Sequence, residues 1–243
     1  MRMITFAQRN AKEILRDPLT LGFGLGFPVV LLLLLTAIQA NIPETIFEID
    51  QITPGISVFG LSFITLFSAS ILAKDRTSAF LQRLYTTPLK PIDFILGYTL
   101  PMIPIAIMQS VICYIVAIFL GLSVKINILL AILLILPISV FFVALGLLFG
   151  SILNDKQVGG ICGALLTNLS GWFSGTWFDL ELVGGAFGKI AYSLPFVHAV
   201  ELERAVLLAN YSDIFSHLWW VLGYAFGALA LAVVSFLRQM KKQ

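Results

Sequence analysis

The sequence predicts an all-α integral membrane protein with six transmembrane helices. Three observations predict it: 59% of the residues are hydrophobic, only 12% are charged, and stretches free of Asp, Glu, Lys and Arg recur along the chain. An ordinary soluble domain is about 25% charged, so a soluble fold could not bury this much apolar surface. We therefore interpret residues 1–243 as a single transmembrane domain.

The six predicted spans are charge-free windows long enough to cross a bilayer, which takes about 20 apolar residues. They lie near Leu19 to Ala40, Gly55 to Ala73, Phe94 to Leu120, Ile126 to Leu153, Val158 to Phe178 and Ile214 to Leu237.

Lysine and arginine predict the orientation, because basic residues resist translocation and gather in cytoplasmic connections. One set of alternate connections holds only three basic residues, Lys125, Lys189 and Arg204. The other set, with the two termini, holds twelve: Arg2, Arg9, Lys12, Arg16, Lys74, Arg76, Arg83, Lys90, Lys156, Arg238, Lys241 and Lys242. Both termini are therefore predicted to be cytoplasmic, in the cytoplasmic (inner) membrane.

Residues 1–18 are predicted to form an amphipathic helix on the cytoplasmic surface rather than a cleaved signal peptide. On a helical wheel one side carries Ile4, Ala7, Ala11, Ile14, Leu15 and Pro18, and the other carries Arg2, Arg9, Lys12, Glu13 and Arg16. The alternative is a basic tail that only sets topology. The recurrence of Arg2, Arg9 and Arg16 every seven residues favours the helix.

The connection at residues 74–93 is predicted to hold a second short amphipathic helix. Its apolar side carries Phe80, Leu81, Leu84 and Tyr85, and its polar side carries Arg76, Gln82, Arg83 and Thr86. Pro88 is expected to end this helix and Pro91 to begin the next span, because proline lacks an amide hydrogen and constrains its neighbour. The apolar side either docks into a groove of a partner protein or rests on lipid headgroups.

Residues 179–213, on the outer side, are apolar and aromatic with few charges. Trp172, Trp177 and Phe178 lie where an interfacial aromatic belt is expected. Residues 187–209 are predicted to form a helix or helical pair that re-enters the outer leaflet and is broken at Pro195. Any break in lipid must be packed against protein, because its backbone needs hydrogen-bond partners.

Several classes of function are disfavoured by what the sequence lacks. No Asp, Glu, Lys or Arg lies in the middle of a predicted span, whereas proton-coupled carriers need titratable groups there. A sodium-coupled carrier built from broken helices stays open. The sequence has no phosphate loop of the G-x-x-x-x-G-K-[ST] type, so ATP hydrolysis by that route is not expected of this chain.

Catalytic, metal and disulfide sites are not expected either. Cys113 and Cys162 lie in apolar stretches and are interpreted as small core residues. His198 and Glu201 share a helical face, but a metal or hydrolytic site needs more ligands. Glu201 is instead expected to pair with Arg204 at i,i+3 spacing. Five glycine pairs at i,i+4 spacing are candidates for close helix contacts: Gly22 with Gly26, Gly146 with Gly150, Gly159 with Gly163, Gly171 with Gly175, and Gly223 with Gly227.

The order of these features resembles the type-2 permease subunits of ATP-binding-cassette (ABC) transporters, a class of exporters. Three stretches carry the resemblance and span the chain in the family's order. They are Leu15-Arg16-Asp17-Pro18 before the first span; Arg83-Leu84-Tyr85-Thr86-Thr87-Pro88-Leu89 followed by Phe94-Ile95-Leu96-Gly97; and Ser174-Gly175-Thr176-Trp177-Phe178 followed by Leu194 to Glu201 and Arg204.

The resemblance implies a non-catalytic permease that forms the translocation path and pairs with a second permease, identical or different, and with two cytoplasmic ATPase subunits. ATP and magnesium would be bound by the ATPase, with no cofactor on this chain and no nucleic-acid partner. The ATPase-docking coupling helix would carry Arg76, Phe80, Leu81, Arg83, Leu84 and Tyr85, and the connecting helix at residues 2–18 would carry Arg9, Lys12 and Arg16.

One departure from the family concerns the start of that connection. The family usually has glutamates there, followed by glycine, whereas this chain has Lys74-Asp75-Arg76-Thr77-Ser78. We therefore expect altered docking chemistry or a specialised ATPase partner. The alternatives to an ATP-driven exporter are an ion-coupled secondary carrier or channel, and an accessory membrane subunit without transport of its own. The substrate is not predicted, because an apolar path suits lipids, drugs and apolar peptides alike.

Overall fold

The computed structural model describes residues 2–78, 80–81 and 89–240, and every regular element in these ranges is a helix. Two of the elements, η1 and η2, are π-helical and rich in glycine. The elements are α1 (Arg2–Leu15), α2 (Pro18–Leu21), η1 (Gly22–Gly26), α3 (Phe27–Gln39), α4 (Ile49–Thr77), α6 (Pro91–Thr99), α7 (Met102–Phe119), α8 (Asn127–Ile152), α9 (Asp155–Val158), η2 (Gly159–Leu166), α10 (Thr167–Trp172), α11 (Leu180–Val183), α12 (Gly185–Ser193), α13 (Pro195–Leu207) and α14 (Tyr211–Met240).

Within the described residues, five helical stretches are long and apolar enough to cross a membrane. They agree with the first four predicted spans and the last one, and the prediction of an all-α, multi-pass chain is confirmed. The stretches are Gly22–Gln39, Ile49–Thr77, Pro91–Phe119, Asn127–Ile152 and Tyr211–Met240.

The predicted fifth span, residues 158–178, takes a different form. The chain is helical from Asp155 through α9, η2 and α10 to Trp172 and then leaves the helix at Phe173. This stretch is not among the five apolar helices, because it begins with the polar residues Asp155, Lys156 and Gln157 and also contains Asn168. A sixth crossing therefore stays a prediction.

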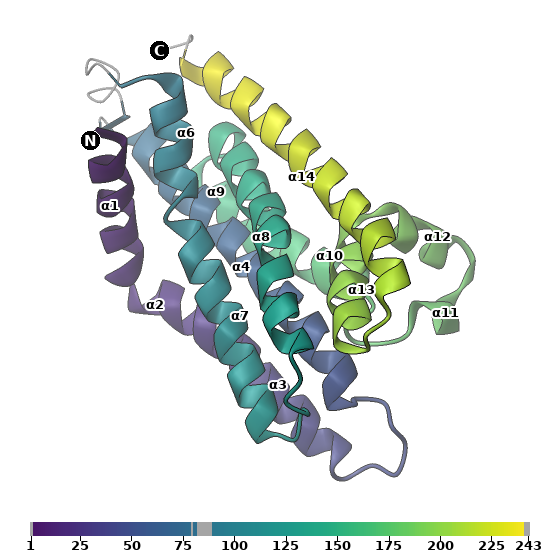
Figure 1. Ribbon diagram of the computed structural model, residues 1–243. Helices are drawn as coiled ribbons and strands as arrows, with labels where there is room; N and C mark the ends of the chain where they lie inside the picture. The colour runs from purple at the N-terminus through teal and green to yellow at the C-terminus, as the bar shows by residue number, and fades with distance from the viewer. Residues whose placement is uncertain (1, 79, 82–88, 241–243) are drawn as a thin grey trace.

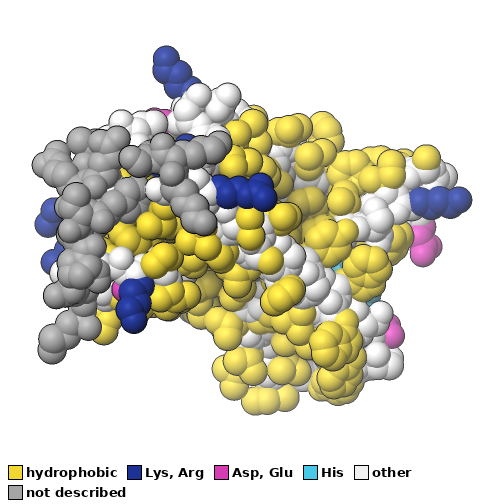
Figure 2. Space-filling model, turned by 90° about the horizontal axis from the view of Figure 1, so that it is seen from above, with side chains coloured by type: hydrophobic (Ala, Val, Ile, Leu, Met, Phe, Trp, Pro, Cys, Tyr) yellow, Lys and Arg dark blue, Asp and Glu magenta, His cyan; other side chains and the backbone are white. Residues whose placement is uncertain are grey.

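The long helices run side by side as a bundle, and both chain termini lie at the same end of it (Figure 1). We call this the terminal end, and the opposite end the far end. The connections after α3 and after α7 lie at the far end, as does the turn between α13 and α14. Viewed onto the terminal end, the molecule shows hydrophobic side chains over its flanks and isolated Lys and Arg side chains near its edges (Figure 2).

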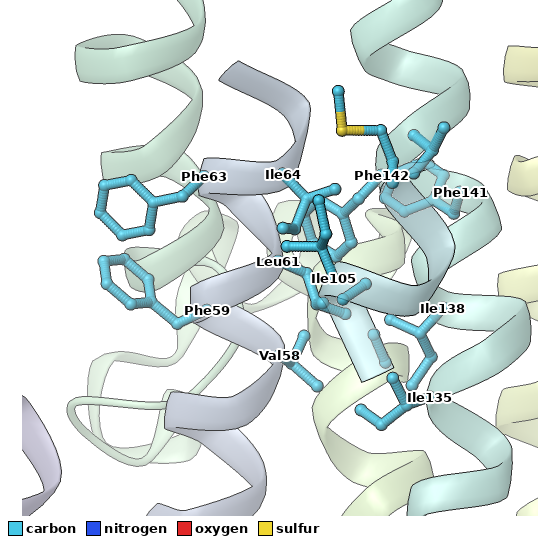
Figure 3. Close-up of a cluster of buried hydrophobic side chains, with 14 of the residues drawn as sticks. Val58, Phe59, Leu61, Phe63, Ile64, Ile105, Ile135, Ile138, Phe141 and Phe142 are labelled. Carbon is cyan, nitrogen blue, oxygen red and sulfur yellow. The ribbon is translucent and has the colours of Figure 1, made fainter. Parts of the chain in front are cut away.

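Helix α4 forms the centre of the bundle. In its most apolar window 89% of the residues are buried, against 22% for the first span and 28% for the last. Leu61 and Ile64 of α4 point towards Ile105 of α7 and towards Ile138 and Phe142 of α8 (Figure 3). The outer helices instead expose large apolar side chains, which suits contact with lipid.

The glycine pairs divide into packed and open ones. A Cβ at Gly146 would lie 2.5 Å from Ser68 Cβ, and one at Gly150 would lie 2.8 Å from the carbonyl oxygen of Ala69. This pair lets α8 approach α4 closely, as small residues do in membrane bundles. In contrast, a Cβ at Gly223 or Gly227 of α14 would meet no atom within 4 Å.

The segment at residues 179–213 is largely helical and packs against the bundle through α13. Helix α12 ends at Ser193, and α13 begins at Pro195, which occupies its first turn. Arg204 of α13 donates to the carbonyl oxygens of Gln51 in α4 and Gly175 in the preceding loop. The predicted break at Pro195 is therefore present and packed against protein, while its place in the outer leaflet stays a prediction.

Candidate functional site

Asp75, in the last turns of α4 at the terminal end, accepts hydrogen bonds from two neighbouring helices. Arg9 of α1 donates to both carboxylate oxygens, with distances of 2.7 Å from Nη1 to Oδ2 and 3.0 Å from Nη2 to Oδ1. The Tyr98 hydroxyl of α6 donates to Oδ2 at 2.9 Å. We call these three residues the Asp75 junction. It joins the amphipathic helix to the second and third spans.

Packing around the junction holds α1 against α6. The buried Asn10 side chain donates to the carbonyl oxygen of Gly97 at 2.9 Å. Phe6 lies over Gly97, where any side chain would collide with its ring, and meets Tyr98 edge to face at 5.0 Å between ring centroids. Glycine is therefore needed at position 97 for α1 to lie this close. Such offset aromatic contacts stabilise a packing geometry as well as burying area.

The first residues of the following connection lie next to the same arginine. The Arg9 guanidinium carbon is 4.4 Å from the centroid of the Phe80 ring, a cation–π geometry. Leu81 is fully buried in the main core. Arg9 thus contacts both Asp75 of α4 and Phe80, which follows α4 in the chain.

In the Asp75 junction a buried carboxylate is paired with a partly exposed guanidinium group. The Asp75 side chain is only 5% exposed, and that of Arg9 is 36% exposed. A buried carboxylate without a partner would be costly, whereas a bidentate arginine and a phenol donor satisfy it. Arg9 also pairs with Glu13 at 2.8 Å, one turn along α1, so its own charge is shared between two carboxylates.

The structure places the predicted docking residues in different surroundings. The Arg76 guanidinium donates to the carbonyl oxygens of Gly150 and Leu153 at 2.6 and 3.2 Å, so it binds the C-terminus of α8. Phe80 lies beside Arg9 of the junction, and Leu81 is buried in the main core. Arg83, Leu84 and Tyr85 lie outside the described residues, and their docking role stays a prediction.

The predicted connecting-helix residues line one surface of α1. Lys12 and Arg16 are exposed, and with Arg9 they border a shallow groove of about 670 Å³ that is formed mainly by polar and charged residues. The apolar side of α1 is used only in part for packing. Phe6 and Ile14 are buried, but Ile4 and Leu15 remain more than half exposed. Helix α1 is thus held along one flank by protein, with apolar side chains left for the membrane interface.

Sequence reasoning missed three residues of this site. Asn10 was not singled out, Asp75 was noted only as a departure from a family pattern, and Tyr98 was not considered. A signal for Asp75 exists in the sequence, because a carboxylate near the end of an apolar helix needs a cationic partner. Its partner, Arg9, lies 66 positions away, and one sequence does not show which of the basic residues makes that contact.

The two histidines contact each other, and the ion pair of Glu201 is with Arg204. His198 Nδ1 is 2.9 Å from His217 Nδ1, while Glu201 pairs with Arg204 at 2.8 Å, so the predicted i,i+3 pair is confirmed. Across the described residues no group of three or more His, Cys, Asp or Glu side chains is placed to hold a metal ion. At the terminal end, the described side chains form ion pairs and hydrogen bonds.

Comparison with known proteins adds one finding to this geometry. The family model of the ABC-2 type transporter matches residues 2–208, which include α1, the Asp75 junction and α13. Comparison with curated proteins gives no match.

Proposed function

Because the chain belongs to the ABC-2 type transporter family, we propose that it is the permease of an ATP-driven exporter and that a separate ATPase docks at the Asp75 junction. Family membership and the five apolar helices make it a multi-pass membrane transport subunit. The ATP-driven step, the direction of transport and the partner ATPase belong to the proposal. ATP and magnesium would be bound by that partner.

The Asp75 junction is the observation that carries the coupling proposal. Charge-assisted bidentate hydrogen bonds are among the strongest polar contacts in proteins and fix orientation as well as distance. The hydrogen bonds of Asp75 join α1, α4 and α6 at the terminal end, and we propose that these helices move together. A push on the connection beside Phe80 would move the central helix α4 together with α1. Closure of an ATPase dimer below the membrane could supply that push.

We further propose six crossings with both termini in the cytoplasm. Both termini lie at one end of the bundle (Figure 1), so the chain must traverse it an even number of times. The stretch Asp155–Trp172 has 18 helical residues, which at about 1.5 Å per residue approaches the thickness of the hydrocarbon core. It is the candidate for the remaining crossing. The basic residues then fall mainly on the cytoplasmic side.

A second permease is proposed to complete the translocation path, because the described helices surround a core that is filled with side chains. The core of α4, α7 and α8 is packed with aliphatic and aromatic side chains (Figure 3). A path between two copies, or between this chain and a related one, needs no opening of that core.

The competing function is a proton-coupled carrier, and one observation favours it. Glu203 of α13 is a fully buried carboxyl group, and buried carboxyl groups serve as proton sites in carriers. The two functions differ in their energy source. Glu203→Gln should stop transport in a proton-coupled carrier, whereas an ATP-driven exporter does not need a transported proton at this position.

The docking proposal predicts a specific defect for Leu84→Asp. A charge placed on the apolar side of the coupling helix would have to be buried unpaired in the ATPase, at a cost of a few kcal/mol. The variant should reach the membrane at normal levels but lose the Mg-ATP hydrolysis that co-purifies with tagged permease.

Arg83→Ala is the matched control for this variant. It removes an adjacent charge from the polar side, and an exposed ion pair contributes only about 0 to 1 kcal/mol. Co-purified hydrolysis should therefore be nearly normal. Normal ATPase association in Leu84→Asp would mean that the apolar side rests on lipid and that docking occurs elsewhere.

A further inference from the structure

Glu203 is the one carboxyl group among the described residues that is buried inside the bundle away from the terminal end. It lies on α13, outside the five spanning helices, and has no exposed surface. Tyr114 of α7, also buried, donates its hydroxyl to Glu203 Oε2 at 2.6 Å. The other carboxyl oxygen, Oε1, has no hydrogen-bond partner. The contact joins α13, which is not among the five stretches that are long and apolar enough to cross a membrane, to α7, which belongs to one of them.

No positive charge faces this carboxyl group. Arg204, the next residue, turns to Glu201, Gln51 and Gly175. Helix α8 contains no charged or titratable residue, and α7 contains only Cys113 and Tyr114. The remaining charged or titratable groups on elements packed against α13 are Lys189 and Tyr192 on α12, Asp50, Lys74, Asp75 and Arg76 on α4, and Tyr211, Asp213, His217, Tyr224 and Arg238 on α14.

None of those groups offsets the burial of Glu203. Burial raises the pKa of Glu203 from 4.5 to about 8, and the hydrogen bond from Tyr114 lowers it only in part. Ser57 Oγ of α4 and Ser110 Oγ of α7 are also buried without a hydrogen-bond partner, but they carry no charge. An ionised Glu203 would therefore be a charge in an apolar interior with a single donor.

Protonation of Glu203 is thus tied to the packed position of α13. The pKa is 4.5 when the group is exposed and about 8 in the packed state, so packing binds a proton between these values. The sign follows from linkage: the packed state is fully favoured below about pH 4.5 and loses stability as pH rises towards 8. The other polar contacts of α13, including that from Asn127 to the Val206 carbonyl oxygen, do not depend on this proton.

We propose that Glu203 is a positioning residue that holds α13 against α7 only while it is protonated, so that alkaline pH on the outer side loosens this helix and slows transport. The proposal goes beyond coupling to the ATPase, because it assigns a pH-dependent step to the opposite half of the molecule. Loss of the proton leaves the contacts of α13 with α4, α8 and α14 in place. It favours movement of the ionised Glu203 side chain out of its apolar site towards water, and this movement separates it from Tyr114 of α7.

The direct test is the infrared difference spectrum of the purified permease between about pH 6 and about pH 9. The wild type should show a carbonyl band of a protonated carboxylic acid that disappears at high pH, and Glu203→Gln should lack it. Glu201→Gln is the control, because that carboxyl group lies two residues away but is partly exposed and paired with Arg204. A titrating band that survives in Glu203→Gln would overturn the proposal.

The functional readout is the pH profile of Mg-ATP hydrolysis by the co-purified complex. Wild type and Glu201→Gln should lose activity as pH rises to about 9, whereas Glu203→Gln should stay active with this loss removed. If Glu203→Gln does not fold, Tyr114→Phe replaces it. Because the hydrogen bond from Tyr114 lowers the pKa of Glu203, hydrolysis by Tyr114→Phe should begin to fall at a higher pH than in the wild type. A pH profile that is unchanged from the wild type in either variant would contradict the proposed role of Glu203 in holding α13 against α7. If Glu203→Gln folds but transport stops while hydrolysis persists, the group carries transported protons and both proposals fail.

Discussion

Asp75 shows how a carboxylate is accommodated near the end of a largely apolar helix. Its two oxygens accept three hydrogen bonds, two from Arg9 and one from Tyr98. An unpaired carboxylate at this buried position would destabilise the fold. Because its donors come from α1 and α6, Asp75 instead connects three helices. Glu203 is the contrasting case, with one donor, no counter-charge and burial on every side.

Asp75→Asn should destabilise the attachment of α1. Asparagine keeps the shape but cannot form the charge-assisted bidentate pair, and hydrogen bonds to charged groups contribute roughly 1.5 to 3 kcal/mol. Partial exposure of Arg9 should place the loss near the lower end of that range. Thermal unfolding of the permease in detergent, with protease cleavage of α1 as a second probe, measures it.

Glu13→Gln is the matched control, since it removes the other carboxylate from the same arginine. The Glu13 side chain is 39% exposed, and such surface pairs contribute about 0 to 1 kcal/mol. Equal effects of the two substitutions would mean that the junction is no stronger than an ordinary surface pair.

At the scale of helices, the contact between α4 and α8 depends on small residues. At Gly150 a Cβ would approach the Ala69 carbonyl oxygen to 2.8 Å and Leu72 Cβ to 2.9 Å, and both belong to the central helix. Backbone cannot swing aside as a side-chain tip can. Gly150→Ala should therefore force the helices apart and cost about 1 to 3 kcal/mol.

Gly227→Ala provides the comparison for that substitution. A Cβ there meets nothing within 4 Å, and alanine favours a helix over glycine by up to about 1 kcal/mol. Melting temperatures in detergent should fall for Gly150→Ala and stay level or rise for Gly227→Ala. Identical shifts would show that the α4–α8 approach does not limit stability.

Much of the element pattern could be predicted from the sequence, because apolar run length reports directly on the membrane. Five spans, the N-terminal helix and the break at Pro195 follow from such local signals. The contacts between helices do not follow from local signals. The spacing of Gly146 with Gly150 is the same as that of Gly223 with Gly227, yet only the first pair meets another helix. Which face of a helix finds a partner depends on the whole bundle.

The candidate site was predictable in position but not in chemistry. Basic residues and prolines predicted an amphipathic helix at residues 2–18 and a connection at residues 74–93 on the same side of the membrane. The actual links, Arg9 with Asp75 and Asn10 with Gly97, join segments 66 and 87 positions apart. Glu203 was interpreted as part of an outer connection. The apolar residues Leu202 and Val206 near it in the sequence indicate that this part of the helix is buried.

At the scale of the whole molecule, the two ends carry different chemistry. The terminal end has the Asp75 junction and the basic surface of α1, which suits docking and force transfer. The opposite half has α13 held by Arg204, Asn127 and Glu203. Helix α4 connects the halves, since its last turns hold Asp75 and its first turns receive Arg204. Helix α4 is therefore the element through which the proposed coupling between the junction and α13 would run.

The most direct test of this account measures the distance between spin labels at Lys12 on α1 and Lys189 on α12 in the complex with its ATPase. Both positions are exposed, so labels should not disturb packing. The account predicts that Mg-ATP shifts the distance distribution, that a collapsed proton gradient leaves it unchanged, and that Asp75→Asn abolishes the shift while ATP is still hydrolysed. A distribution that ignores Mg-ATP and follows the proton gradient would contradict the ATP-driven mechanism.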